Sequence, residues 1–251
     1  MDLDDTLLNK ENIITEYSKN IINSLRSKGY LFIFNTARSY LATSSYIIDM
    51  EPDYSILNGG TLILDKDMNI IHKEIIDPIM ANEIINMIKA DSYVTNFSVQ
   101  SETGLYTRDL DYVRINGLAL YNSFDEPICE GVYKIMLATT EKLKYIKYAE
   151  KNGLDFESYF NGIWCRVAKG NKYLGNLWLF NYLKDDNPMD YVFGDDTGDS
   201  LMIKNAYHGV YLINSDPKIR YEGANVTRYD SDSDGACRYL EDLLLRNGEC
   251  L

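Results

Sequence analysis

The chain has 251 residues, of which 45% are hydrophobic and 25% charged, a globular composition that excludes a disordered chain, a collagen-like repeat and a coiled coil. Its 38 acidic residues outnumber its 25 basic ones, and the formal net charge of −13 argues against general binding to nucleic acid, whose phosphate backbone such a surface repels. A chain of this length can form one large domain, or an ordinary domain that carries a smaller one.

Neither secretion nor membrane insertion is indicated. The acidic start, with Asp2, Asp4 and Asp5, lacks the basic and apolar regions of a signal peptide. The longest apolar runs, such as 30–34, are far shorter than the ~20 residues of a membrane-spanning helix. The four cysteines are scattered without paired spacing, which favours reduced thiols over a zinc site. We therefore expect a cytoplasmic protein without membrane partners, whose oligomeric state the sequence does not indicate.

Helix and strand patterns alternate at both ends of the chain. Apolar residues recur at helical spacing in 15–28, where Gly29 is a natural stop, and the unbroken apolar run 30–34 predicts a strand covered on both faces. A second helix is predicted around 174–182, followed by a strand at 191–193, a helix at 200–205 and a strand at 210–213. This alternation predicts an α/β domain with a mainly parallel sheet.

The middle of the chain has a different pattern. Residues 77–166 begin with a helical pattern near 80–88 and continue with short strand-like runs at 93–99, 104–108, 132–138 and 162–167, with a helix near 143–149. Strand pairs with intervening helices predict a small α+β module inserted into the α/β domain.

Six carboxylates gather in two tight groups: Asp2, Asp4 and Asp5, then Asp195, Asp196 and Asp199. An arbitrary acidic cluster is more often a solvated turn, but the second group directly follows the predicted strand at 191–193, where α/β sheets place their ligand sites. If the first group lies at an adjacent strand end, the carboxylates converge and raise one another's pKa unless a cation separates them. Oxygen-only ligands of this kind favour Mg²⁺.

Four short motifs resemble those of the haloacid dehalogenase (HAD) superfamily, and more closely its Cof-type phosphatases with a type-IIB cap. The first is D-L-D-D-T-L at 2–7, the second N-T-A-R at 35–38, and the fourth G-D-D-T-G-D at 194–199. The third motif is a lysine. Lys172 lies 23 residues before Asp195, close to the usual distance, whereas Lys169 lies 26 residues before it, so we assign Lys172.

The spacing of the motifs also locates the cap. Thr36 comes 34 positions after Asp2, which leaves room for one helix and one strand, but Lys172 comes 136 positions after Thr36, far more than a crossover needs. The resemblance thus implies a Rossmann-like core from 1–76 and 167–251, with a mainly parallel sheet, and an inserted α+β cap of type IIB at 77–166.

The resemblance implies a Mg²⁺-dependent phosphatase that acts on a small phosphorylated metabolite, such as a sugar phosphate or a cofactor phosphate. Asp2 would attack phosphorus to form an aspartyl-phosphate, and Asp4 would protonate the leaving oxygen and later activate water. The ion would be held by the Asp2 carboxylate, the Asp4 carbonyl and Asp195, with Asp199 acting directly or through water.

Other residues are implied to bind the phosphate and the substrate. Thr36 would donate a hydrogen bond to a phosphate oxygen, and Lys172 would neutralise charge on the nucleophile and the transferring group. The main-chain amides of Leu3 and Asp4 are the expected remaining donors. The remaining candidates for substrate binding are Arg38, which could equally pair with an Asp, Asn58 and Gly59.

Three departures from the family pattern bear on this interpretation. Gly198 stands where the fourth motif usually has Asn, and Tyr173 replaces a glycine that often follows the motif lysine. Met1 directly precedes Asp2, so the apolar strand expected before the nucleophile is missing. Either the protein begins upstream, or the central sheet is incomplete, another segment must pair the exposed strand edges, and stability and activity are lower than in relatives.

Two other functions remain open from the sequence: a phosphomutase of the same superfamily, and a catalytically impaired sugar-phosphate binding protein. A phospho-receiver regulator is disfavoured because a receiver is smaller and needs no such insertion.

Overall fold

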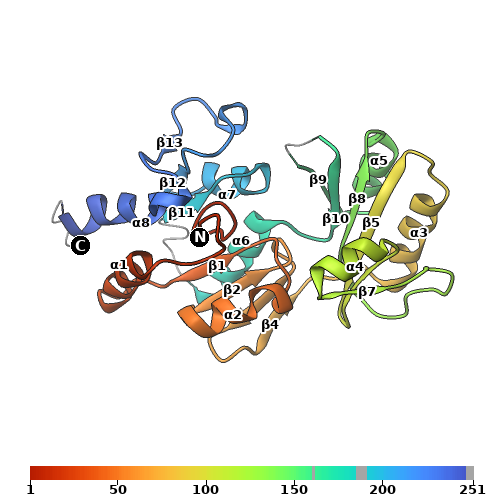
Figure 1. The fold of residues 1–251 in the computed structure, drawn as a ribbon, viewed down its shortest axis with the longest axis horizontal. Coiled ribbons are helices and arrows are strands. Elements are labelled where there is room, and N and C mark those ends of the chain that lie inside the picture. The colour runs from red at the N-terminus through yellow and green to blue at the C-terminus, as the bar shows by residue number, and fades with distance from the viewer. Residues whose placement is uncertain (160–161, 185–190, 247–251) are drawn as a thin grey trace.

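The computed structural model describes residues 1–159, 162–184 and 191–246, and within them the strands form three sheets (Figure 1). The four-stranded sheet has the order β1-β2-β3-β4, with β1 and β2 parallel and the later pairs antiparallel. Its strands and the neighbouring helices are α1 (Glu16–Ser27), β1 (Ile33–Asn35), α2 (Tyr40–Met50), β2 (Tyr54–Leu57), β3 (Leu62–Asp65) and β4 (Ile70–Lys73).

The three-stranded sheet is parallel and has the order β11-β12-β13. It is built with α6 (Lys172–Leu183), β11 (Tyr191–Gly194), η1 (Thr197–Asp199), α7 (Ser200–Lys204), β12 (His208–Tyr211), η2 (Pro217–Ile219) and β13 (Asn225–Val226). The chain then passes through η3 (Ser231–Ser233) and α8 (Gly235–Leu240) into a π-helical segment, η4 (Glu241–Arg246).

The first two residues lie between these two sheets. The Met1 amino group donates to the Ile33 carbonyl at 2.8 Å, and the Asn35 amide donates to the Met1 carbonyl at 2.9 Å, both in β1. On the other side, the Asp2 amide donates to the Phe193 carbonyl of β11 at 3.1 Å. Residues 1 and 2 therefore pair the facing edges of β1 and β11, and this pairing fixes Asp2 at the junction of the two sheets.

The six-stranded sheet is formed by the middle of the chain, at the right of Figure 1, and has the order β7-β6-β5-β8-β10-β9. Its pairs are antiparallel except for β6 with β7. The elements are α3 (Pro78–Lys89), β5 (Val94–Ser101), β6 (Leu105–Thr107), α4 (Leu110–Asn116), β7 (Ala119–Tyr121), β8 (Val132–Thr139), α5 (Leu143–Lys151), β9 (Asp155–Ser158) and β10 (Trp164–Ala168).

Two large apolar clusters lie in different parts of the chain, and among the described residues of the middle segment only Tyr133 belongs to the first of them. One contains Leu3, Ile22, Phe34 and Phe193 and joins α1, β1, β11 and the first residues of the chain. The other lies between the six-stranded sheet and its helices and includes Ile84, Leu137 and Tyr145. Each part thus buries its own apolar surface, the main source of folding free energy. The α/β fold class is confirmed, and the domain boundaries at 76/77 and 166/167 stay a prediction.

The predicted elements are largely present, with shifted ends. The helix predicted over 15–28 is α1, which starts where the Thr15 side chain accepts a hydrogen bond from the Ser18 amide. The strand predicted at 30–34 is shorter, because β1 begins only at Ile33 and the Phe32 amide instead donates to the Asp53 carboxylate at 2.8 Å. The elements that were not predicted from the sequence are helices α2 and α4 and strands β2, β3, β4, β7, β9 and β13.

The structure describes three of the four cysteines and the lengths of the helices. Cys129, Cys165 and Cys237 are free thiols, and the last two are buried, whereas Cys250 lies outside the described residues. Helices α1, α3 and α6 have 12 residues each, well below the ~20 needed to cross a bilayer. Among the described residues, no helix is both long and apolar enough to span a membrane.

We expect Gly60→Ala to destabilise the protein by roughly 3 kcal/mol or more. Gly60 has a φ of 102°, and a Cβ there would collide with the Asn171 carbonyl just before α6. Gly170→Ala is the matched control, because a Cβ there meets only ordinary contacts, the nearest at 3.6 Å. Urea unfolding of the three proteins measures the difference, and equal destabilisation by both substitutions would contradict the expectation.

Candidate active site

Three carboxylates meet where the four-stranded sheet and the three-stranded sheet join. Asp2 follows Met1 between β1 and β11, while Asp195 and Asp199 lie in the turn after β11. One oxygen from each lies within 4.8 Å of the others, and Asp2 and Asp199 are buried. The two acidic groups of the sequence, almost 200 positions apart, therefore converge at the carboxyl ends of neighbouring strands.

Lys172 connects two of these carboxylates. Its Nζ donates to Asp2 Oδ1 at 2.7 Å and to Asp199 Oδ1 at 2.6 Å, and its side chain is 9% exposed. Burial alone would lower the pKa of Lys172, but Asp199 and Asp2 more than offset this and raise the pKa above the ordinary lysine value. The ammonium is therefore charged throughout the neutral range.

The first turn of α6 fixes the Lys172 backbone. The Asn171 side chain caps the helix by accepting from the Leu174 amide at 3.0 Å. The Asn35 side-chain amide, at the end of β1, donates to the Lys172 carbonyl and to Asn176 Oδ1, each at 2.9 Å. Strand β1 and helix α6 are thus tied together directly beside the lysine.

The site carries more negative charge than Lys172 can neutralise. Burial, followed by the Asp199 charge, raises the pKa of Asp2 to about 7, and Lys172 only partly opposes this. Burial, Asp2 and Asp199 together raise the pKa of Asp195 to about 9. Oxygen ligands in surplus at one buried point are the donor set that a divalent cation such as Mg²⁺ prefers, so these residues fit that ion.

The three carboxylates are not equivalent. Asp199 Oδ2 accepts from the amides of Asp195 and Asp196 at 3.1 and 3.2 Å, while its Oδ1 is taken by Lys172. Asp195 accepts only a long hydrogen bond, 3.3 Å from the Thr6 hydroxyl, within the described chain. Asp195 and Asp2 therefore keep oxygens available for a cation, whereas Asp199 holds the turn and the lysine in place.

The loops after β1 and β2 lie against each other beside the three carboxylates Asp2, Asp195 and Asp199, here called the triad. Thr36 is fully buried, and its carbonyl accepts from the Gly59 amide at 2.9 Å, while the Arg38 carbonyl accepts from the Asn58 amide at 2.8 Å. The buried Asn58 side-chain oxygen has no donor among the described residues. Likewise, the Leu3 amide makes no hydrogen bond with the described chain, which leaves it available to an anion.

Asp4 and Arg38, from the segments that carry Asp2 and Thr36, form an ion pair. Arg38 Nε lies 3.0 and 2.9 Å from the two Asp4 oxygens, and Nη2 also contacts Oδ1. The Asp4 side chain is 49% exposed, in contrast to buried Asp2. Of the two roles considered for Arg38, the structure places it on a carboxylate.

Three charged residues of the six-stranded sheet also reach the site, and sequence reasoning missed them. Lys134 of β8 donates to the Ala37 carbonyl, between Thr36 and Arg38. Arg166 of β10 donates through Nη1 to the Gly59 carbonyl at 2.8 Å, and Glu157 of β9 lies beside Gly198. A single polar residue inside each apolar run, at 134 and at 166, was the available signal.

Lys169, the lysine not chosen for the third motif, lies away from the triad. Its Nζ pairs with Glu74 at 3.3 Å, and its side chain is half exposed. Lys172 is therefore the motif candidate that the fold brings to the carboxylates.

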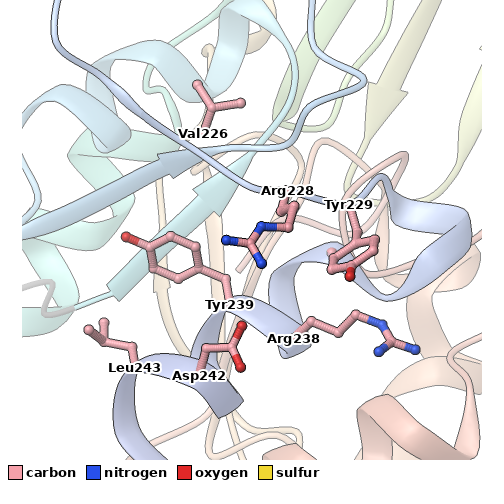
Figure 2. Close-up of a pocket in the computed structure, with 8 residues that line it drawn as sticks. Val226, Arg228, Tyr229, Arg238, Tyr239, Asp242 and Leu243 are labelled. Atoms are coloured by element: carbon pink, nitrogen blue, oxygen red, sulfur yellow. The ribbon is translucent and has the colours of Figure 1, made fainter. Parts of the chain in front are cut away.

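A separate hollow of about 300 Å³ lies near the end of the chain, between β13 and α8 with η4 (Figure 2). Its lining includes two arginines and two tyrosines, and it consists of Val226, Arg228, Tyr229, Gly235, Arg238, Tyr239, Asp242 and Leu243. None of the triad carboxylates lines it. It is therefore distinct from the acidic site.

The class of protein follows from a comparison with known families. Residues 1–240 match the haloacid dehalogenase-like hydrolases, and the chain belongs to this family. It is thus an enzyme of the hydrolase class.

Individual relatives are distant but cover the whole chain. A protein of Buchnera aphidicola subsp. Acyrthosiphon pisum, named as a "putative phosphatase", is 25% identical over 99% of this chain and 97% of its own length. A Haemophilus influenzae protein named in the same way is 23% identical over 96% of this chain and 95% of its own length.

Solved structures show the same fold. A haloacid dehalogenase-like hydrolase from B. subtilis superposes with a TM-score of 0.81 at 20% identity, covering 97% of this chain and 98% of its own. A sugar phosphatase of HAD subclass IIB gives a TM-score of 0.80 at 18% identity, covering 96% of both chains.

We expect Lys134→Met to change how stability depends on pH. Burial, followed by the Arg166 charge, lowers the pKa of Lys134 from 10.5 to about 7. Between those values the unfolded chain holds a proton that the folded protein lacks, so this residue makes stability rise with pH by up to ~1.4 kcal/mol per unit. The variant should be most stabilised relative to the wild type below pH 7, and this advantage should shrink toward pH 10.5.

Urea unfolding at intervals from pH 6 to 10 measures this trend, with Lys147→Met as the control because Lys147 is an exposed lysine of α5. If the Lys134→Met and wild-type curves run parallel across this range, the expectation is wrong.

Proposed function

We propose that the chain is a Mg²⁺-dependent phosphatase that hydrolyses small phosphorylated metabolites through an aspartyl-phosphate intermediate on Asp2. The observation that carries the proposal is the buried contact of Lys172 with Asp2, next to an uncompensated carboxylate at Asp195. Residues 77–166 are proposed to form a cap on a core made of 1–76 and 167–251.

The first step would be an attack of an Asp2 carboxylate oxygen on phosphorus, which breaks the bond between phosphorus and the leaving alcohol oxygen. Lys172 would stabilise charge on the transferring group, together with the Thr36 hydroxyl and the free amide of Leu3. Asp4 would give its proton to the leaving oxygen. Its pairing with Arg38 supports a role for Arg38 in orienting Asp4.

The second step would transfer the phosphoryl group from Asp2 to water. Asp4, now a carboxylate, would take a proton from the attacking water, and inorganic phosphate would leave as Asp2 is restored. Mg²⁺ would be held by the Asp2 and Asp195 carboxylates and the Asp4 carbonyl, with Asp199 acting through water. When bound, the ion would offset the repulsion between an anionic nucleophile and an anionic ester.

The substrate is proposed to be a sugar phosphate or a cofactor phosphate. The subclass of the solved sugar phosphatase supports the first choice. The side chains of Lys134 and Asn58, next to the loop that contains Thr36, are proposed to contact the organic part of such an ester.

Asp2→Asn is expected to lower turnover of p-nitrophenyl phosphate with Mg²⁺ by roughly a thousandfold or more, because the amide is a poor nucleophile and removes the partner of Lys172. Asp49→Asn, an acidic position that pairs with Lys19, is the control and should keep wild-type turnover. Phosphate release from a panel of sugar and cofactor phosphates then identifies the preferred ester. Turnover that does not depend on Asp2 would contradict the mechanism, and no turnover at all would favour a binding protein.

Removing divalent cations with EDTA should abolish turnover, and Mg²⁺ should restore it. Asp195→Asn is expected to weaken Mg²⁺ binding by roughly 100-fold. Because an ion that binds only the folded state stabilises it, Mg²⁺ should raise the melting temperature of the wild type, and this rise should vanish in the variant. Equal Mg²⁺-induced shifts in both proteins would exclude Asp195 as a ligand.

A further inference from the structure

One face of the six-stranded sheet is polar and lies against the rest of the protein. In the pairing of β10 with β9, Arg166 is opposite Glu157 and Ala168 is opposite Asp155. In the pairing of β10 with β8, Ala168 is opposite Lys134, so these charged side chains share one face. The intervening residues, such as Val167 and Ile135, belong to the apolar cluster on the other face. The charged face is therefore set by strand alternation.

Arg166 fixes this face on one loop of the core. Its side chain is 2% exposed, and Nη1 donates to the Gly59 carbonyl at 2.8 Å. Its Nη2 pairs with Asp155 and its Nε with Glu157, each at 3.0 Å. A Cβ at Gly59 would collide with the guanidinium, so this contact depends on a glycine. Two carboxylates and a carbonyl thus hold the buried cation in one orientation.

Glu157 lies against the turn that carries Asp195 and Asp199. A Cβ at Gly198 would lie 2.5 Å from Glu157 Oε1, closer than real Cβ contacts allow. Gly198 is the central residue of η1, between Thr197 and Asp199. Its φ does not lie in the left-handed region, so the backbone tolerates a side chain there, but that side chain would have to displace the Glu157 carboxylate, which pairs with Arg166 at 3.0 Å.

The Glu157 carboxylate is also electrically close to the triad. Its side chain is 15% exposed, and burial raises its pKa, while Arg166 and Lys172 act in the opposite direction and Asp199 adds to the rise. A carboxylate of the six-stranded sheet therefore occupies the space next to the turn that a side chain of residue 198 would otherwise fill.

We propose that Glu157 is a positioning residue of the active site, whose carboxylate replaces a side chain at position 198 and holds the Asp195–Asp199 turn in its buried arrangement. Arg166 orients Glu157, and the Gly59 carbonyl orients Arg166. The six-stranded sheet then does more than cover a substrate, because the placement of Asp195 and Asp199 depends on its contact with the core. This inference rests on the proposed phosphatase function.

Three variants test the proposal: Gly198→Asn, Glu157→Ala and the double substitution. Gly198→Asn should be impaired by the collision with Glu157, and Glu157→Ala by the empty space beside the turn. In the double variant the Asn side chain can occupy that space. We expect each single variant to lower kcat roughly tenfold with little change in KM, and the double variant to exceed both in kcat. The melting temperatures without metal should follow the same order.

Glu102→Gln is the matched control, since Glu102 also pairs with a cation, Lys73, between the six-stranded sheet and β4 but lies outside the triad. It should keep wild-type kcat. The proposal is overturned if Gly198→Asn matches the wild type, or if the double variant is no better than Glu157→Ala alone.

The two proposals can fail separately. If the wild type releases no phosphate from any ester, the proposed function fails. The melting temperatures then still show whether the Gly198→Asn and Glu157→Ala substitutions compensate each other. Reciprocal recovery in the double variant supports the contact, and simple addition of the two losses excludes it.

Discussion

The arrangement of the site depends on one buried ammonium. Lys172 contacts Asp2 at the start of the chain and Asp199 after β11, so three distant segments meet at a single positive charge. A buried cation without these partners would be costly, and the two carboxylates without the cation would repel each other. Each segment therefore requires the others, and the pairing of Met1 and Asp2 between β1 and β11 places the aspartate where this contact can form.

Much of this centre could be predicted from the sequence, because its residues lie in short segments whose positions in an α/β fold are constrained. Asp195 directly follows a strand, and strand ends in such sheets converge. The choice of Lys172 over Lys169 used the distance to Asp195 that is usual in the haloacid dehalogenase family, and the structure places Lys172 beside the carboxylates and Lys169 on Glu74. The helices with clear apolar spacing, such as α1, were equally accessible.

The contribution of the middle segment could not be predicted in the same way. Arg166 and Glu157 become neighbours only through the register of β10 and β9, which no local pattern encodes. Strand β9 has four residues, of which only Phe156 is apolar, so its alternation is too short to indicate a strand from the sequence. The pairing of Arg38 with Asp4 was one of two alternatives, and only the folded loops distinguish them.

The ion pair between Lys169 and Glu74 has a geometric consequence. Glu74 lies on the segment that enters the six-stranded sheet and Lys169 on the segment that leaves it, so the two connections run next to each other. Two connections that are tied together hold the six-stranded sheet in place more firmly than one would, because a single connection leaves rotation about the chain free. The same ion pair helps to keep Arg166 and Glu157 aligned with Gly59 and Gly198, the glycines that they contact.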